Sequence, residues 1–324
     1  MREVAFINQN KTKWLEIEQA IYGKTKLSPD DMANLYIQLM NDLSFAQTYY
    51  KKSNTTKYLN QLAVTIYQKI YKTKRTDQNR ILYFFKTELP LILHKNRKTI
   101  WFSFILFFIF CGIGVLSSHY DDSFVRLILS DEYVDETMEN IRNGDPVAIY
   151  QGGSNWGSFL GITINNMRVA ALCFITGALA GLFTMYIYMQ NAIMIGAFQY
   201  MFYREGVLWE SVQGIWIHGA MEIFSIVIAA AAGFGIAKAI FFPQTFSRLL
   251  SFINGFKENL KIYLSTLPFF FFAGLLEGFV TRYAKAMGPA GCYAIIISTF
   301  LIISFYYLIY PHIVYRQQKN AINE

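Results

Sequence analysis

The chain has 324 residues, of which 54% are hydrophobic and only 16% are charged, and its mean hydropathy is positive. A soluble domain usually carries about a quarter charged residues, so this composition argues against a soluble enzyme. Charges are concentrated in the first hundred residues and in the connections between apolar runs. This segregation predicts an all-α membrane protein, because lipid can hide long uncharged runs from water.

Residues 1–95 are predicted to form a basic helical domain in the cytoplasm. The first hundred residues contain 17 basic and 8 acidic residues. Pro29 suits the first position of a helix, on which Leu39 and Leu43 then recur at helical spacing. The domain is predicted to end, over residues 78–94, in an amphipathic helix on the membrane surface. We expect anionic lipid head groups rather than nucleic acid as its partner, because the basic stretch leads directly into the membrane.

Residues 96–324 are predicted to form a bundle of about six transmembrane helices. A spanning helix needs about 20 apolar residues. Five runs meet this requirement: Ile100–Ser117, Met167–Tyr188, Val212–Ile236, Ile262–Thr281 and Ala290–Tyr310. A sixth apolar run, Ala192–Tyr203, is too short to be assigned from its composition alone.

The distribution of basic residues predicts how these helices are oriented, since cytoplasmic connections are enriched in lysine and arginine. The loop at about 119–160 holds eight acidic and two basic residues and is placed outside, whereas the basic segments 94–98 and 238–261 are placed inside. Three crossings are needed to bring the chain from the outer loop at 119–160 to the inner segment 238–261. Ala192–Tyr203 must therefore cross the membrane in addition to Met167–Tyr188 and Val212–Ile236. The expected protein is therefore a multi-pass protein of the cytoplasmic (inner) membrane type with both termini in the cytoplasm.

Ionisable residues within the predicted spans are the candidate functional residues, because such groups are costly in lipid. His218 and Glu222 are four residues apart and share one helix face, and Glu277 lies at a similar depth on the next span. The outer end of the second span adds three polar residues to this predicted pocket: Asn165, Asn166 and Arg168.

Three interpretations of the pocket stay open. The polar groups can hold the bundle together by hydrogen bonds, form a proton or solute site, or support metal-assisted hydrolysis. The last is the weakest, because one histidine and two glutamates lack a further histidine or cysteine ligand. We therefore expect no catalytic residue, no metal and no cofactor.

Small residues at helical spacing predict close contacts between helices: Gly177 with Gly181, Gly274 with Gly278, and Ala229 with Gly233. In addition, Ile175–Thr184 and Phe272–Thr281 share glycine, leucine and threonine at matching positions. On the expected orientation these segments run in opposite directions, as a three-plus-three inverted repeat would require.

Four stretches of the sequence also form a recognisable set: residues 131–140 with 144–146, residues 165–170 with Gly177 and Gly181, residues 215–223 with 228–233, and residues 272–281. Together they resemble the stage II sporulation protein M family of bacterial integral membrane proteins. The HGxxE stretch (His218–Glu222) and the EGFxT stretch (Glu277–Thr281) are the most specific parts of this resemblance.

The resemblance implies a membrane member of a complex rather than an enzyme. The namesake acts with peptidoglycan-degrading partners in septum remodelling, and some relatives are encoded near MoxR-type ATPases and RDD-type membrane proteins. The long N-terminal domain is a departure from the namesake. We expect a scaffold in an envelope-associated complex, with envelope proteins or further copies of itself as partners. The alternative is a transporter or channel that uses His218, Glu222 and Glu277.

Overall fold

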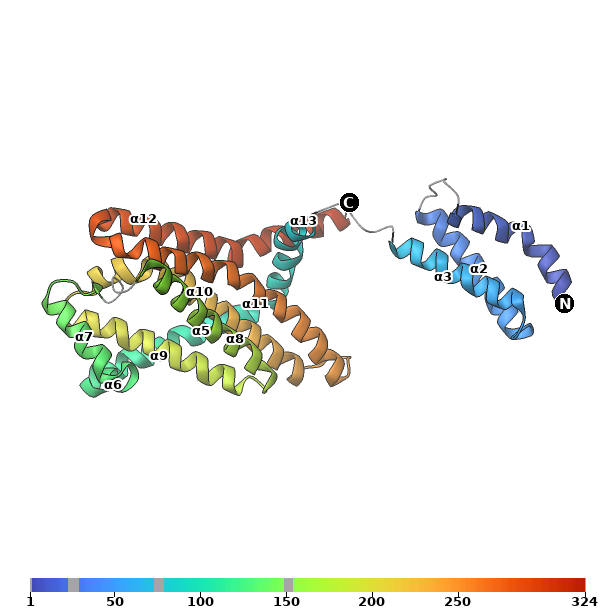
Figure 1. Ribbon diagram of the computed structural model, residues 1–324. Helices are drawn as coiled ribbons and strands as arrows, with labels where there is room; N and C mark the ends of the chain where they lie inside the picture. The colour runs from blue at the N-terminus through green and yellow to red at the C-terminus, as the bar shows by residue number, and fades with distance from the viewer. Residues whose placement is uncertain (1, 23–28, 73–78, 149–153, 324) are drawn as a thin grey trace. The chain divides into compact units, whose positions relative to one another are not determined.

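The computed structural model describes residues 2–22, 29–72, 79–148 and 154–323, and the secondary structure elements in these ranges are all helices. The chain divides into two compact units, Met1–Asn79 and Arg80–Glu324 (Figure 1). The segment 80–95, which we expected to belong to the first domain, is therefore part of the second unit.

The first unit is built from three helices, α1 (Glu3–Tyr22), α2 (Pro29–Tyr49) and α3 (Asn54–Lys72). The start of α2 agrees with the sequence pattern, and Leu39 and Leu43 are buried as their spacing predicts. Their cluster also contains Phe6, Trp14, Ile17, Leu59 and Ile66. The unit thus has a hydrophobic core of its own.

The second unit begins with one long helical segment made of α4 (Arg80–Tyr83), a π-helical turn η1 (Phe84–Glu88) and α5 (Leu89–Tyr120). Two tyrosines near the end of the chain fix this turn. Tyr306 donates a hydrogen bond to the carbonyl of Phe85, and Tyr310 donates one to the carbonyl of Lys86, both at 3.0 Å. These bonds explain why the segment packs with the bundle.

The remaining long helices are α8 (Asn155–Ile175), α9 (Leu182–Arg204), α10 (Leu208–Phe241), α11 (Arg248–Phe279), α12 (Ala284–Ser304) and α13 (Tyr310–Asn323), with a π-helical turn η5 (Phe305–Ile309) before α13. By length and apolar composition, four stretches of the described residues can cross a membrane: Arg80–Tyr120, Asn155–Ala178, Leu208–Phe241 and Arg248–Ala321. The last contains α11 together with α12 and α13. The predicted helical membrane bundle is confirmed.

The predicted span Met167–Tyr188 is wrong. A 3-10 turn η3 (Thr176–Ala178) ends α8, and Ala180 and Gly181 adopt left-handed backbone conformations (φ 58° and 74°) before α9 begins. The sequence is apolar on both sides of this turn, so hydropathy marks no boundary there. The short run Ala192–Tyr203 belongs to α9, a full-length helix that is not among the four stretches above.

Helix α10 is the centre of the bundle and contacts α5, α8, α9, α11 and α12. Most of its apolar segment is buried within the protein. Glycine permits the closest approach: a Cβ on Gly233 would lie 2.1 Å from the carbonyl oxygen of Cys173, and a Cβ on Gly177 would lie 2.2 Å from that of Gly233. The backbones of α8 and α10 therefore touch where any side chain would separate them.

Two glycines of α5 provide a matched test of such packing. A Cβ on Gly114 would lie 2.2 Å from the carbonyl oxygen of Ile193 on α9, whereas a Cβ on Gly112 meets open space. We expect Gly114→Ala to lower stability by about 1–3 kcal/mol through overpacking. Gly112→Ala should leave stability unchanged or raise it slightly, because alanine favours a helix over glycine.

The measurement is thermal unfolding of both variants in detergent micelles. Equal unfolding temperatures for the two variants would contradict the close contact between α5 and α9.

Candidate functional site

Three ionisable side chains meet inside the bundle. His218 and Glu222 project from the same face of α10, and Glu277 comes from the last turn of α11. Their exposed fractions are 4%, 8% and 2%. One potential ligand atom from each lies within 4.8 Å of the other two, and His218 Nε2 is 3.7 Å from Glu277 Oε2. The structure therefore brings the three central residues of the predicted pocket together.

The sequence around Glu277 allows α11 to pack closely against α8. A Cβ on Gly274 would lie 1.9 Å from Thr163 Oγ1, and a Cβ on Gly278 would lie 2.6 Å from the carbonyl oxygen of Asn155. These two glycines flank Glu277 in sequence. Larger residues at either position would push α11 away from α8 and would disturb the position of Glu277.

Thr281 orients the histidine. Its hydroxyl lies 3.0 Å from His218 Nδ1 and donates to the carbonyl of Leu276 at 3.3 Å. The other ring nitrogen of His218, Nε2, is the one that faces Glu277.

The two glutamates are incompletely satisfied. Glu222 is hydrogen-bonded by the side chain of Asn166 from α8. Glu222 Oε1 and Glu277 Oε2 are nevertheless buried and have no hydrogen-bond partner. Buried polar atoms are almost always paired, because leaving one unpaired costs a few kcal/mol. The cluster therefore has two acceptor oxygens in need of a proton or a cation.

Not all of the predicted pocket residues join this cluster. Asn166 reaches Glu222, but Asn165 and Arg168 are exposed on the surface of α8. Sequence reasoning did not place Thr281 in the pocket, although it ends the EGFVT segment that contains Glu277. Its contact with His218 depends on a 3-10 turn, η4 (Thr281–Tyr283), which helical periodicity does not describe.

The two segments of the proposed repeat occupy comparable places in the chain but differ in conformation. Ile175–Thr184 contains the turn between α8 and α9, and Phe272–Thr281 contains the end of α11 before the turn to α12. Gly181 has a left-handed backbone, whereas Gly278 is helical. Gly177 and Gly181 therefore do not lie on one straight helix, and the inverted repeat stays a prediction.

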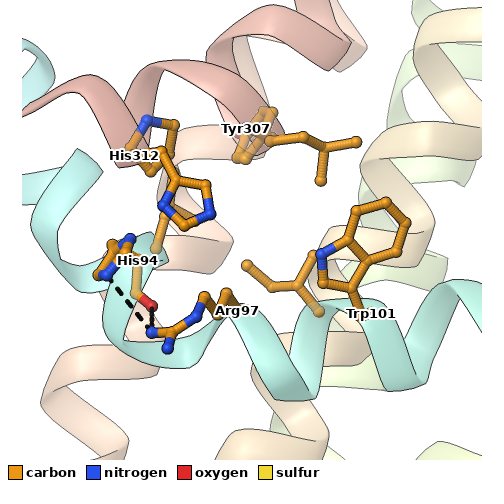
Figure 2. A pocket seen from close by; sticks show the side chains of 9 residues that line it. His94, Arg97, Trp101, Tyr307 and His312 are labelled. Carbon is orange, nitrogen blue, oxygen red and sulfur yellow. Dashed lines mark hydrogen bonds between the residues drawn. The ribbon is translucent and has the colours of Figure 1, made fainter. Parts of the chain in front are cut away.

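A cleft lies where the first turns of α5 meet η5 and α13 (Figure 2). Its ring-bearing and basic lining residues include His94, Arg97, Trp101 and His312. His94 also stacks on Tyr315, with ring centroids 4.0 Å apart. The residues that line this cleft are different from those of the His218–Glu222–Glu277 cluster.

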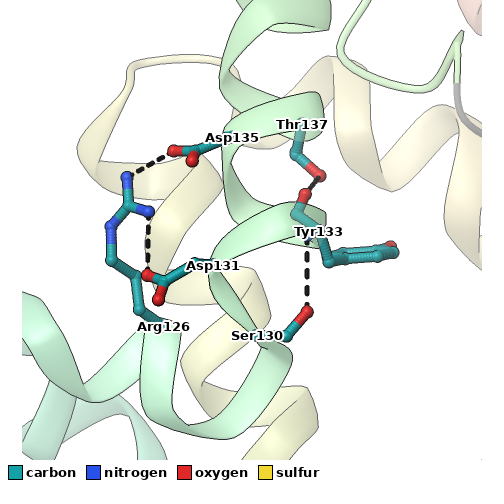
Figure 3. A network of polar contacts seen from close by, with 6 residues as sticks. All are labelled: Arg126, Ser130, Asp131, Tyr133, Asp135 and Thr137. Atoms are coloured by element: carbon teal, nitrogen blue, oxygen red, sulfur yellow. Dashed lines mark hydrogen bonds and ion pairs between the residues drawn. The ribbon is translucent and has the colours of Figure 1, made fainter.

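The acidic connection between α5 and α8 is a folded surface rather than an open loop. It forms α6 (Asp122–Leu129) and α7 (Asp131–Arg142), and Val125 and Val134 pack in one cluster with Met201 of α9. Figure 3 shows how Arg126 joins the two helices.

Arg126 bridges two acids of α7. Its guanidinium lies 3.1 Å from Asp131 Oδ1 and 2.7 Å from Asp135 Oδ1, and Ser130 caps α7 by accepting from the Tyr133 amide (Figure 3). Hydrogen bonding to Arg126 lowers the pKa of Asp135 below its ordinary value. An arginine thus holds the sharp connection between the two helices.

The lowered pKa gives a prediction with a defined sign. A carboxylate whose pKa is lowered by folding adds stability above its unfolded pKa, and this contribution is lost as the pH falls through the lowered folded pKa. We expect the Asp135 carboxyl to titrate below pH 3.8 in the full-length protein, and Arg126→Gln to return the midpoint toward that ordinary value. Carbon-detected NMR of the carboxyl measures both midpoints, and equal midpoints would show that the Arg126 contact is absent.

Comparison with known protein families gives two matches. The model described as stage II sporulation protein M matches residues 103–282, and one described as a domain of unknown function (DUF8413) matches residues 4–72. No curated protein and no solved structure matches the chain. The second range corresponds to α1–α3. The first covers more than half of the chain, from α5 to the turn after α11, and contains the whole buried cluster, so the chain belongs to the stage II sporulation protein M family.

Proposed function

We propose that this membrane protein is a non-enzymatic scaffold that recruits partners into a bacterial envelope-associated complex. The observation that carries the proposal is the packing of the bundle around α10. Helix α10 is mostly buried by its neighbours, and His218, Glu222 and Glu277 are each at least nine-tenths buried. Such packing suits a rigid platform better than a pathway for solute.

The distribution of charge supports an orientation for this platform. Six helices, α5, α8, α9, α10, α11 and α12, would cross the membrane in alternating directions. The connection between α10 and α11, which Lys238 and Arg248 flank, would then lie on the same side as the start of α5, and the acidic helices α6 and α7 on the other. Because basic connections face the cytoplasm, both termini would be cytoplasmic in the inner membrane.

The two sides offer surfaces of opposite charge. Five exposed acids line α7: Asp131, Glu132, Asp135, Glu136 and Glu139. This face suits an envelope protein with a basic surface, since charge complementarity steers association. The basic N-terminal unit would meet anionic head groups and cytoplasmic proteins. MoxR-type ATPases and RDD-type membrane proteins are the partner classes proposed here, together with further copies of this chain.

Cysteine labelling tests the orientation. Glu136 on α7 and Lys257 on α11 are both exposed. In intact cells whose outer barrier admits the reagent, an impermeant maleimide should label Glu136→Cys. Lys257→Cys should react only after the cytoplasmic membrane is opened. The unmodified chain, with Cys111, Cys173 and Cys292, is the background control. Labelling of Lys257→Cys in intact cells would reverse the proposed orientation.

Charge reversal tests the scaffold role. We expect replacement of Glu132, Glu136 and Glu139 by lysine to abolish cross-linking of envelope partners, while the protein still inserts at normal levels. His218→Gln and Glu222→Gln should keep those partners if they insert normally. The measurement is cross-linking in the native host followed by quantitative mass spectrometry. If the lysine variant keeps its partners while the pocket variants lose function, the transport alternative replaces the scaffold.

A further inference from the structure

We propose that His218, Glu222 and Glu277 bind one divalent transition-metal ion of the Zn²⁺ or Mn²⁺ class. The residue types alone made this interpretation weak, because only one histidine is present. The structure adds three observations that composition does not contain: the contact of His218 Nδ1 with Thr281, the unsatisfied oxygens of both glutamates, and the spacing of the three ligand atoms.

The contacts of its two ring nitrogens suit His218 as a ligand. His218 Nδ1 is hydrogen-bonded to Thr281 Oγ1 at 3.0 Å. The other ring nitrogen, Nε2, lies 3.7 Å from Glu277 Oε2. A hydrogen bond to one ring nitrogen is the usual support for a histidine that binds a metal through the other.

The charges match a divalent ion. Glu222 and Glu277 bring two carboxylates into a place with little water, and Glu222 Oε1 and Glu277 Oε2 have no hydrogen-bond partner there. Two negative charges at this depth are costly unless they are neutralised. One ion of charge two neutralises both, so that the buried cluster carries no net charge.

The spacing is compatible with coordination. Zinc binds imidazole nitrogen and carboxylate oxygen at about 2.1 Å, which places neighbouring ligands of a tetrahedral site about 3.4 Å apart. The distance of 3.7 Å between His218 Nε2 and Glu277 Oε2 is close to this value, and all three ligand atoms lie within 4.8 Å of one another. Nitrogen and carboxylate ligands together suit Zn²⁺, Mn²⁺ and related ions rather than soft ions that prefer thiolates.

Such an ion would be a cross-link within the bundle. Two of its ligands belong to α10 and the third belongs to the end of α11, while Asn166 of α8 holds Glu222 through a hydrogen bond. The site would therefore join three helices at one point. The proposed metal site has a structural role and involves no chemical reaction. It is compatible with the scaffold role and does not depend on it.

The test uses the full-length protein in detergent, stripped with a chelator and titrated with Zn²⁺ or with Co²⁺, whose visible d–d absorption reports its ligands. We expect stoichiometric binding by the unmodified chain and a higher unfolding temperature in the presence of metal. Glu222→Gln and Glu277→Gln should each lose stoichiometric binding. Glu210→Gln, which changes an exposed acid on the same helix as Glu222, should bind normally.

Thr281→Val keeps the three ligands and removes only the group that orients His218. It should weaken metal affinity by about 10–100-fold, and it keeps the proposal testable if the glutamine variants do not fold. The proposal is overturned if the stripped wild-type protein binds no stoichiometric metal. It is equally overturned if Thr281→Val and the folded glutamine variants bind as tightly as the wild-type protein. If the stripped wild-type protein binds no metal, an infrared band from a buried protonated carboxyl would identify a proton as the neutralising ion.

Discussion

The close contact between the backbones of α8 and α10 is the constraint on which the rest of the bundle depends. In lipid, helices gain little from apolar burial against one another, so close packing and hydrogen bonds must hold them together. Gly177 and Gly233 provide the contact, and Ser103 adds a buried hydrogen bond to the carbonyl of Val227 at 2.9 Å. Tyr188 of α9 donates to the carbonyl of Ser103 at 2.8 Å, which ties α5, α9 and α10 together.

The same packing explains why the ionisable cluster is buried. A helix surrounded by five others has no face toward lipid over most of its length, so His218 and Glu222 must find partners within the protein. Glu277 can supply one because the glycines beside it let α11 pack closely against α8. Protein partners do not satisfy every carboxylate oxygen. A divalent ion would complete the set and would fasten α10 to α11 at the point where the polar groups are concentrated.

The acidic face on α7 and the N-terminal unit are each folded by contacts of their own. Arg126 and packing on α9 hold the acidic face on α7 in place, as the proposed scaffold role requires. The N-terminal unit has its own aromatic core and matches a separate family model. The family match thus covers helices of the bundle, and a unit that matches a separate family model precedes the bundle in this chain.

Hydropathy and charge in the sequence were enough to predict a helical membrane bundle, a helical N-terminal domain and the pairing of His218 with Glu222 on one face. These features depend on the spacing of apolar and polar residues within a single segment, so no contact with another segment has to be known. The turn at residues 176–181 could not be predicted, because apolar residues continue through it and only the backbone of Ala180 and Gly181 marks it. The contacts of Glu277 and Thr281 with His218 were also decided by tertiary structure, since they join α10 to α11 and its terminal turn. Which side chains of separate helices meet depends on how closely the backbones pack, and hydropathy does not record that distance.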